Sequence, residues 1–386
     1  MAHIAIVSIP HTGHMDRLYG VATELVRRGH EVTFVTTATR AGQVRELGAE
    51  AIEYRSPMED EAAAANRDDD LSTVLPRLLR EAKAVLPVME RRLGTRAPDC
   101  VLTDVLAWGG AVFAHKHGIV DIQMWLFFAS NEVFSLEDRY ESSLGDLSLL
   151  EEFHTDLTAF ADEVRTPGVA EYIFASRDRN IVFMPRVFQY AGDTFDERFV
   201  FVGPGLVQAD PPKSGEGPPL VLMSMGTAHD RGSQFFRACA LAMADLPIRL
   251  LLVTGGCVDL AELQDLPGNV EVKEWIDYAA TLGRADVFVT HGGINGVMEA
   301  LHYAVPVVVI PDRMEQIANA ERVVELGVGV RVSKVGELRD AVLGVLSGNE
   351  IRKRLGEMRA AVRSAGGPSA AADAIEGWIK LRPRAS

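Results

Sequence analysis

The sequence is poor in cysteine, in aromatic side chains and in positive charge. Its three cysteines, Cys100, Cys239 and Cys257, are far apart along 386 residues and show no metal-binding spacing. An odd, scattered set of this kind is typical of reduced thiols, and we expect all three in the core of a cytoplasmic protein. Aromatic residues make up only 7% of the chain, while small and aliphatic residues are plentiful. This mixture favours layered α/β structure over a β-sandwich.

The shortage of positive charge argues against two classes of binding partner. Acidic residues number 54 and basic residues 39, so the net charge is −15 at pH 7. A surface of that sign repels phosphate backbones and anionic lipids, so we expect neither nucleic acid nor a membrane surface as partner. The longest strongly apolar run, Ala304 to Ile310, is far shorter than the ~20 residues of a membrane span. Met1 to Val7 contain no basic leader, so we predict a cytoplasmic protein, either a monomer or a homodimer.

The length and the order of elements predict two α/β domains. The chain opens with an apolar run from His3 to Ile9, a Gly-containing loop, a helical pattern and a second apolar run from Glu31 to Thr36. This order is typical of a parallel sheet, and a similar series starts at Leu220 after a segment rich in Pro, Gly and charge. We therefore predict two Rossmann-like domains facing across a cleft. Their boundaries are residues 1–205, a linker at 206–219, residues 220–368, and a helix at 369–386 that can pack back on the first domain.

Other segments of the first domain also have patterns that predict helices or strands. Leu71 to Leu93 is amphipathic and predicts a helix despite two prolines, and Cys100 to Thr103 predicts a strand. Most of Ser130 to Arg179 has helical spacing. The aromatic residues between Trp125 and Phe174 could line an apolar acceptor pocket or fill a helical core, and the pattern does not distinguish these roles.

The stretch from Thr290 to Glu299 (THGGINGVME) carries the clearest binding signal. It lies where a strand pattern ends and a helix pattern begins, so its glycines allow close backbone approach and the helix N-terminus can bind an anion. His291 and Asn295 can donate hydrogen bonds to phosphate oxygens. Glu299, one helical turn beyond Asn295, can accept hydrogen bonds from ribose hydroxyls. A Gly-rich turn capped by Asn is the alternative interpretation.

This stretch resembles the nucleotide-binding signature of family 1 glycosyltransferases, which include plant, macrolide and bacterial UDP-glycosyltransferases and have the GT-B fold. The similarity continues upstream at Trp275 to Tyr278, downstream at Pro311 to Gln316, and at the N-terminus in Gly13-His14, so it covers both domains. The resemblance implies that Trp275 stacks on the nucleobase and that Glu315 and Gln316 bind sugar hydroxyls.

The loop Met225-Gly226-Thr227 also resembles a loop of that family that approaches the phosphates of the donor. A simple turn is the alternative interpretation. Together, the motifs predict that the nucleotide-sugar donor is bound by Gly13, Gly226, Thr227, Trp275, Ile276, His291, Gly293, Asn295, Gly296, Glu299, Glu315 and Gln316. The sequence departs from the family pattern at three places. Gly296 replaces a Ser or Thr whose hydroxyl usually reaches the α-phosphate, Tyr278 replaces the Gln of plant members, and Asp16-Arg17 replace a common Asn-Pro pair.

Two residues of the first domain are the predicted catalytic pair. His14 follows a strand-to-helix turn, and an imidazole has the pKa needed to take a proton from a hydroxyl near neutral pH. His11 is close enough to be a rival, but the resemblance favours His14. Asp104 ends a predicted strand at the sheet edge where open α/β folds bind ligands, and the resemblance implies that it bonds the base His14. The alternatives are a capping or second-sphere histidine and a helix-capping aspartate.

We expect no metal or other cofactor. The only Asp-rich triplet, Asp68-Asp69-Asp70, lies in an acidic loop without an adjoining strand, and a solvated charge run explains it better than a metal site. The diphosphate is then held by the helix N-terminus and His291.

The reaction implied by the resemblance is an inverting, metal-independent transfer of a hexose to a small apolar natural product such as a macrolide or polyphenol. UDP-glucose is the favoured sugar donor, and dTDP-sugars are the alternative. Three alternatives remain: a nucleotide-sugar epimerase of the same fold, a non-catalytic nucleotide-sugar binder, and a dinucleotide dehydrogenase. The last requires Gly-x-Gly-x-x-Gly after the first strand, which Pro10 to His14 do not supply.

Overall fold

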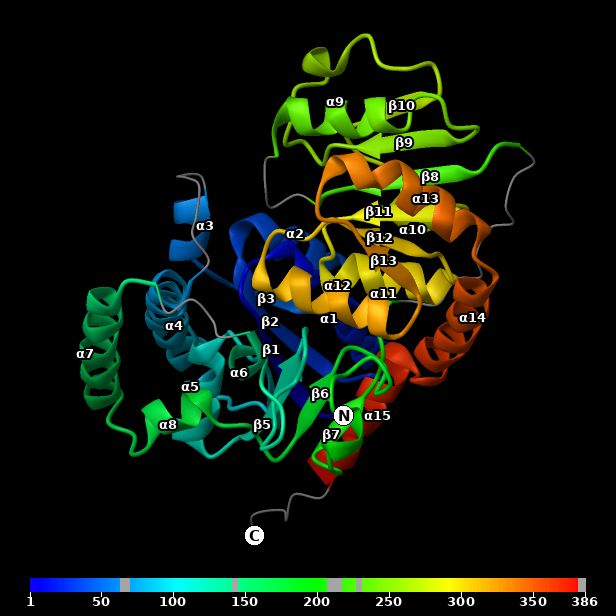
Figure 1. Cartoon of the computed structure of the whole chain (residues 1–386). Helices are drawn as coiled ribbons and strands as arrows, with labels where there is room; N and C mark the ends of the chain where they lie inside the picture. The colour runs from blue at the N-terminus through cyan, green and yellow to red at the C-terminus, as the bar shows by residue number, and fades with distance from the viewer. Residues whose placement is uncertain (63–69, 141–144, 207–216, 227–230, 381–386) are drawn as a thin grey trace. The chain divides into compact units, whose positions relative to one another are not determined.

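The computed structural model describes residues 1–62, 70–140, 145–206, 217–226 and 231–380 (Figure 1). Contacts divide the chain into unit 1, Met1–Val207 with Ala365–Ser386, and unit 2, Gln208–Ser364. Each unit contains one sheet in which every strand pairing is parallel, so the predicted α/β class is confirmed. Among the described residues, no helix combines the length and the apolar character needed to cross a membrane.

Unit 1 is a seven-stranded sheet of order β3-β2-β1-β4-β5-β6-β7. Its strands are β1 His3–Val7, β2 Glu31–Thr37, β3 Glu50–Tyr54, β4 Cys100–Asp104, β5 Val120–Trp125, β6 Asn180–Val182 and β7 Phe199–Phe201. Its helices are α1 Thr12–Arg27, α2 Ala38–Glu46, α3 Pro57–Ala62, α4 Leu71–Leu93, α5 Trp108–His117, α6 Leu136–Tyr140, α7 Leu147–Val164, α8 Val169–Phe174 and α15 Gly367–Lys380, with a 3-10 turn at Gly192–Thr194.

Helices cover both faces of this sheet. Ala5 and Val7 of β1 point into a core shared with α4, α5, α7 and α8, whereas Ile4 and Ile6 point into a second core shared with α1, α2 and α15. A strand that is buried on both faces needs apolar residues at successive positions, and this explains the continuous apolar run at the start of the chain.

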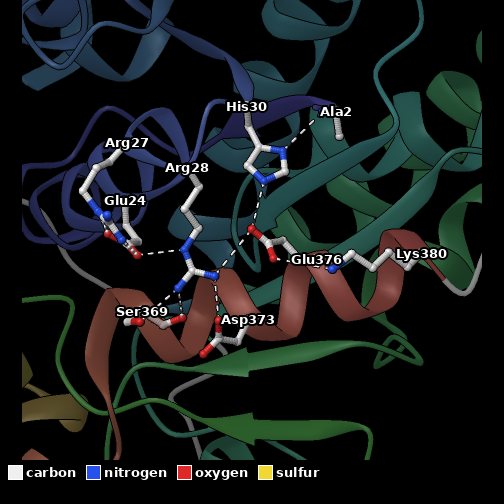
Figure 2. Close-up of polar contacts among 9 residues, drawn as sticks. All are labelled: Ala2, Glu24, Arg27, Arg28, His30, Ser369, Asp373, Glu376 and Lys380. Atoms are coloured by element: carbon white, nitrogen blue, oxygen red, sulfur yellow. Dashed lines mark hydrogen bonds and ion pairs between the residues drawn. The ribbon is translucent and has the colours of Figure 1, made fainter.

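The last helix of the chain, α15, packs on α1 through a cluster of charged groups (Figure 2). Arg28 donates to Asp373 at 2.6 Å and to the Ser369 carbonyl at 3.1 Å, and its Nε donates to Glu24 at 2.8 Å. His30 lies 3.1 Å from Glu376. Because α15 also adds Ala371, Ala372 and Ile375 to the core with α1, residues from the end of the chain help to fix the helix that carries His14.

Unit 2 is a six-stranded sheet of order β10-β9-β8-β11-β12-β13. Its strands are β8 Leu220–Ser224, β9 Arg249–Val253, β10 Val270–Lys273, β11 Val287–Thr290, β12 Val307–Val309 and β13 Gly329–Arg331. Its helices are α9 Gly232–Ala242, α10 Tyr278–Leu282, α11 Ile294–Tyr303, α12 Met314–Glu325, α13 Leu338–Ser347 and α14 Asn349–Ser364, with 3-10 turns at Leu260–Leu263 and Val335–Glu337. One core lies between the sheet and α9 and α13, and α11 packs against α14.

One sequence expectation needs correction, and one alternative is excluded. Cys100 and Cys239 are buried thiols, but Cys257 is only half-buried, because it lies in a loop after β9 rather than in the core. Asp104 does not cap the next helix: α5 begins at Trp108, and its N-cap position is Ala107. The Asp104 side chain therefore has another structural role.

Candidate functional site

The turn between β1 and α1 positions the predicted base. Strand β1 ends at Val7, and α1 starts four residues after Ser8, with His11 at its N-cap and Gly13 and His14 in its first turn. Strand β4 pairs with β1 so that Val7 lies opposite Thr103. This register brings Ser8 and Asp104, the next residues along each chain, to the same carboxyl edge of the sheet.

His14 and Asp104 are in direct contact, as the sequence predicts. Nδ1 of His14 lies 2.8 Å from Oδ2 of Asp104. The same oxygen accepts a hydrogen bond from the Ser8 hydroxyl at 2.8 Å, and Oδ1 accepts one from the Leu106 N–H at 3.1 Å. Asp104 is fully buried, so each of these donors compensates for solvation that the carboxylate has lost.

The surroundings of Asp104 keep it ionised. Burial alone would raise the pKa of Asp104, but the charge and hydrogen bond of His14, with the Leu106 N–H and the Ser8 hydroxyl, lower it below its ordinary value. A carboxylate only accepts hydrogen bonds, so the neutral His14 ring carries its proton on Nδ1 and its basic lone pair on Nε2. The pair can therefore take up a proton at Nε2 and stabilise the resulting imidazolium.

Two aromatic rings flank His14. The ring of His11 lies edge-on at 5.8 Å between centroids, and the ring of Phe127 lies at 6.5 Å. The His14 side chain is 17% exposed, while His11 is exposed. Of the two histidines, His14 is the one that contacts the buried Asp104 carboxylate, and this contact distinguishes it from His11 as the candidate base.

In unit 2, His291 is packed between two glycines. A Cβ built onto Gly226 would lie 2.8 Å from Cε1 of His291, and one built onto Gly293 would lie 2.6 Å from its Nε2. Gly226 also has a φ of +77°, which favours glycine. The imidazole therefore sits between the loop after β8 and the start of α11, and both loops need glycine to admit it.

The glycine turn after β11 is tied to the start of α12. Gly292 has a φ of +93°, and its carbonyl accepts a hydrogen bond from Nδ2 of Asn319 at 2.8 Å. The same Nδ2 lies 3.3 Å from Oε1 of Glu315, and Oε1 of Gln316 accepts the Asp312 N–H at 3.0 Å. Asn319 thus joins the glycine turn with Glu315, and the backbone oxygen of Gln316 lies 3.3 Å from a Cβ built onto Gly292, so both residues predicted to bind the sugar lie next to this turn.

The other residues predicted to bind the nucleotide sugar lie on neighbouring elements of unit 2. Asn295, Gly296 and Glu299 are on α11, whose first-turn N–H groups have no acceptor inside the helix. Trp275 is 62% exposed in the loop after β10, so its ring is not part of the hydrophobic core. It lies beside Gly256, where an added Cβ would be 3.1 Å from its Cζ2, and Ile276 next to it is half-buried. Thr227 lies outside the described residues.

Sequence reasoning missed two contributors to these sites. Ser8 donates to the Asp104 carboxylate, and its position follows from the β1–β4 register once both strands are assigned. Tyr278 was noted only as a departure, yet its hydroxyl lies beside Gly296. No sequence spacing indicates that contact, because α10 and α11 are brought together by the fold.

The acidic triplet gives no metal site among the described residues. Asp70 accepts hydrogen bonds from the Thr73 N–H and the Ser72 hydroxyl, so it caps the start of α4. Asp68 and Asp69 lie outside the described residues. Over the parts of the chain that the structure describes, no group of three His, Cys, Asp or Glu side chains could hold a metal ion.

This chain is similar in sequence and in fold to known proteins. The C-terminal domain profile of the erythromycin biosynthesis protein CIII-like family matches residues 251–376. The NDP-glycosyltransferase YjiC of Bacillus subtilis (strain 168) is 33% identical over 98% of this chain and 97% of its own. The demethyllactenocin mycarosyltransferase of Streptomyces fradiae is 35% identical over 98% of this chain and 87% of its own. The crystal structure of CalG4, the calicheamicin glycosyltransferase, has a TM-score of 0.86 and 33% identity, covering 99% of this chain and 100% of that one.

Proposed function

This chain belongs to the GT-B glycosyltransferase family that contains bacterial NDP-glycosyltransferases and macrolide glycosyltransferases, and on that premise we propose that it moves a hexose from a nucleotide sugar to a hydroxyl of a small apolar natural product. The observation that carries the proposal is the contact of His14 with the fully buried Asp104. Two relatives are named for natural products, demethyllactenocin and calicheamicin, which supports an acceptor of that class.

The proposed reaction is an inverting displacement. Nε2 of His14 removes the acceptor hydroxyl proton, and the oxygen attacks the anomeric carbon from the side opposite the diphosphate. The new glycosidic bond forms as the bond between that carbon and the diphosphate oxygen breaks, so the configuration inverts. The proton stays on His14, where Asp104 stabilises the imidazolium. His291 and the N–H groups of the first turn of α11 stabilise the departing diphosphate.

The proposed donor is UDP-glucose, with dTDP-sugars as the alternative. Glu315 and Gln316 support a sugar with free hydroxyls, because one offers a carboxylate acceptor and the other an amide donor. Oε1 of Gln316 accepts the Asp312 N–H, so the NH₂ group is the part of that side chain suited to donate to a hydroxyl. Holding the diphosphate by a helix N-terminus and His291 requires no metal in this scheme.

Ligand-induced thermal stabilisation tests the donor site. A ligand at ~100 times its Kd stabilises by about 2.7 kcal/mol, which raises the melting temperature by several degrees. We expect UDP or UDP-glucose to do this equally with and without EDTA, and NAD to have no effect. Stabilisation by NAD alone, or a UDP effect that EDTA removes, would contradict the proposed donor site.

A transfer assay tests the reaction itself. The protein is incubated with UDP-glucose or dTDP-glucose and a panel of macrolide, polyphenol and simple phenol acceptors, and products are identified by mass spectrometry and by the anomeric coupling in NMR. Acceptor-dependent formation of a β-glucoside from the α-linked donor supports inverting transfer. A changed sugar in the donor without acceptor would indicate an epimerase, and nucleotide binding without any turnover would indicate a non-catalytic binder.

A further inference from the structure

Tyr278 is held in a defined position beside the donor-binding helix α11. It is the first residue of α10, directly after the N-cap Asp277, whose side chain accepts the Ala280 N–H at 3.0 Å. Its ring packs edge-on against Phe288 of β11, with 5.8 Å between centroids and 83° between planes. Phe288 is 1% exposed, so the tyrosine ring rests against a fixed part of the core.

The hydroxyl of Tyr278 lies next to the first turn of α11. A Cβ built onto Gly296 would be 3.3 Å from that oxygen and 3.2 Å from Cε1 of Phe288. Both contacts are tight, so a side chain at position 296 would have to displace its neighbours. Glycine at 296 therefore leaves this helix without a hydroxyl of its own there and gives the space to the hydroxyl of Tyr278.

The same hydroxyl is suited to donate to an anion. Across the described part of the chain, no residue forms a hydrogen bond with it, although Tyr278 is half-buried. Burial and the nearby charge of Glu299 raise the pKa of Tyr278 well above its ordinary value, so the group stays protonated at neutral pH. Its oxygen thus lies beside Gly296 and within electrostatic reach of Glu299, which is one turn further along α11.

We propose that the Tyr278 hydroxyl donates a hydrogen bond to the nucleotide phosphate nearest the ribose, at the N-terminus of α11. The inference rests on the proposed function, in which the first turn of α11 binds the diphosphate, and on the sequence-based expectation that Glu299 accepts hydrogen bonds from the ribose. A hydroxyl placed near both Gly296 and Glu299 reaches the group that joins these two parts of the nucleotide. Tyr278 is then a donor-binding residue supplied by α10 rather than by α11.

Calorimetric titration of Tyr278→Phe with uridine, UMP and UDP, and with the thymidine series, tests the assignment. A hydrogen bond to a charged group is worth about 1.5–3 kcal/mol, so we expect UMP and UDP to bind roughly 10-fold or more weakly and uridine to bind within twofold of the unsubstituted protein. Tyr303→Phe is the matched control. It removes a second half-buried hydroxyl that Glu299 also influences, at the other end of α11, and should leave the affinities for all of these ligands unchanged.

A second variant checks the geometry. Tyr278→Phe combined with Gly296→Ser removes one hydroxyl and returns another to the same space, so we expect UDP affinity to recover relative to Tyr278→Phe alone. Equal weakening of uridine and UDP in Tyr278→Phe, or no weakening of UDP, would overturn the role of Tyr278 while leaving the proposed function intact. If the unsubstituted protein bound none of these nucleotides, the proposed function would fail, and this assignment with it.

Discussion

The Ser8 hydroxyl donates to the same oxygen of Asp104, Oδ2, that contacts Nδ1 of His14, and both distances are 2.8 Å. Two donors therefore converge on one carboxylate oxygen, while Oδ1 accepts the Leu106 N–H. The carboxylate is fully buried and cannot turn without breaking several hydrogen bonds. Its orientation, and through it the orientation of the His14 ring, is set by β1, β4 and the loop that follows β4.

Replacing Asp104 should separate the role of its charge from the role of its shape. Asp104→Asn keeps the size but removes the charge that supports the His14 imidazolium, so we expect kcat to fall on the order of 10²-fold or more with UDP affinity unchanged. Ser8→Ala is the control, because it removes one donor to the same oxygen and keeps the charge. It should cost about 0.5–1.5 kcal/mol of stability and change kcat only slightly. A kcat of Asp104→Asn close to that of the unsubstituted enzyme would remove Asp104 from the mechanism.

The two histidines of the β1–α1 turn should behave differently. His14→Ala removes the group that contacts Asp104, and we expect transfer to fall on the order of 10²-fold or more while donor binding persists. His11→Ala removes an exposed ring 5.8 Å away and should retain activity within a few-fold. Steady-state rates and UDP affinities of both variants make the comparison. Loss of transfer in His11→Ala with activity kept in His14→Ala would reverse the assignment.

The depressed pKa of Asp104 predicts a specific loss of stability in acid. Its pKa is lower in the folded protein than the value of about 3.9 expected when unfolded, so it contributes stability that is fully present above that value. The contribution is lost as the pH falls through the folded-state pKa. The stabilities of the unsubstituted protein and Asp104→Asn, measured by urea unfolding, should therefore differ by a constant amount from pH 5.5 down to about 4, and the difference should shrink as the pH falls further below about 3.9. A difference that stays the same well below that pH would show that the carboxylate charge does not matter to stability.

The sequence predicts most of the strands, including β2 and β3, which contain polar as well as apolar residues, but it does not predict β5, β7 or β13. Leu220–Ser224 and Val287–Thr290 are found where the apolar runs indicate. Strand β5 was not predicted, because Asp121 interrupts its apolar pattern. In the fold that carboxylate is buried and accepts from Thr103 and from Arg177, both at 2.7 Å, and neither partner can be inferred from local sequence. Strands β7 and β13 have three residues each, too few to show a period.

Some contacts in the candidate sites could be predicted from the sequence, and others depend on the fold. The contact of His14 with Asp104 was predictable, because a motif and a strand end each identify one residue at the carboxyl edge of a sheet. The packing of His291 against Gly226 was not, since β8 and β11 are far apart in sequence and only their pairing brings these loops together. The same is true of Tyr278 and Gly296, which the sequence shows only as two separate departures from a family pattern.

The packing of His291 makes Gly226 a sensitive position for donor binding. In Gly226→Ala, the new Cβ would lie 2.8 Å from Cε1 of His291, and the φ of +77° would be strained by about 1–2 kcal/mol. The imidazole would have to move, so we expect UDP affinity to fall by roughly 10-fold or more, together with a lower melting temperature. Gly344→Ala is the matched control: this glycine lies inside α13 with nothing within 4 Å of an added Cβ, and alanine there should stabilise by about 0.5–1 kcal/mol. If Gly226→Ala bound UDP as tightly as Gly344→Ala, His291 would not be held at the diphosphate by this loop.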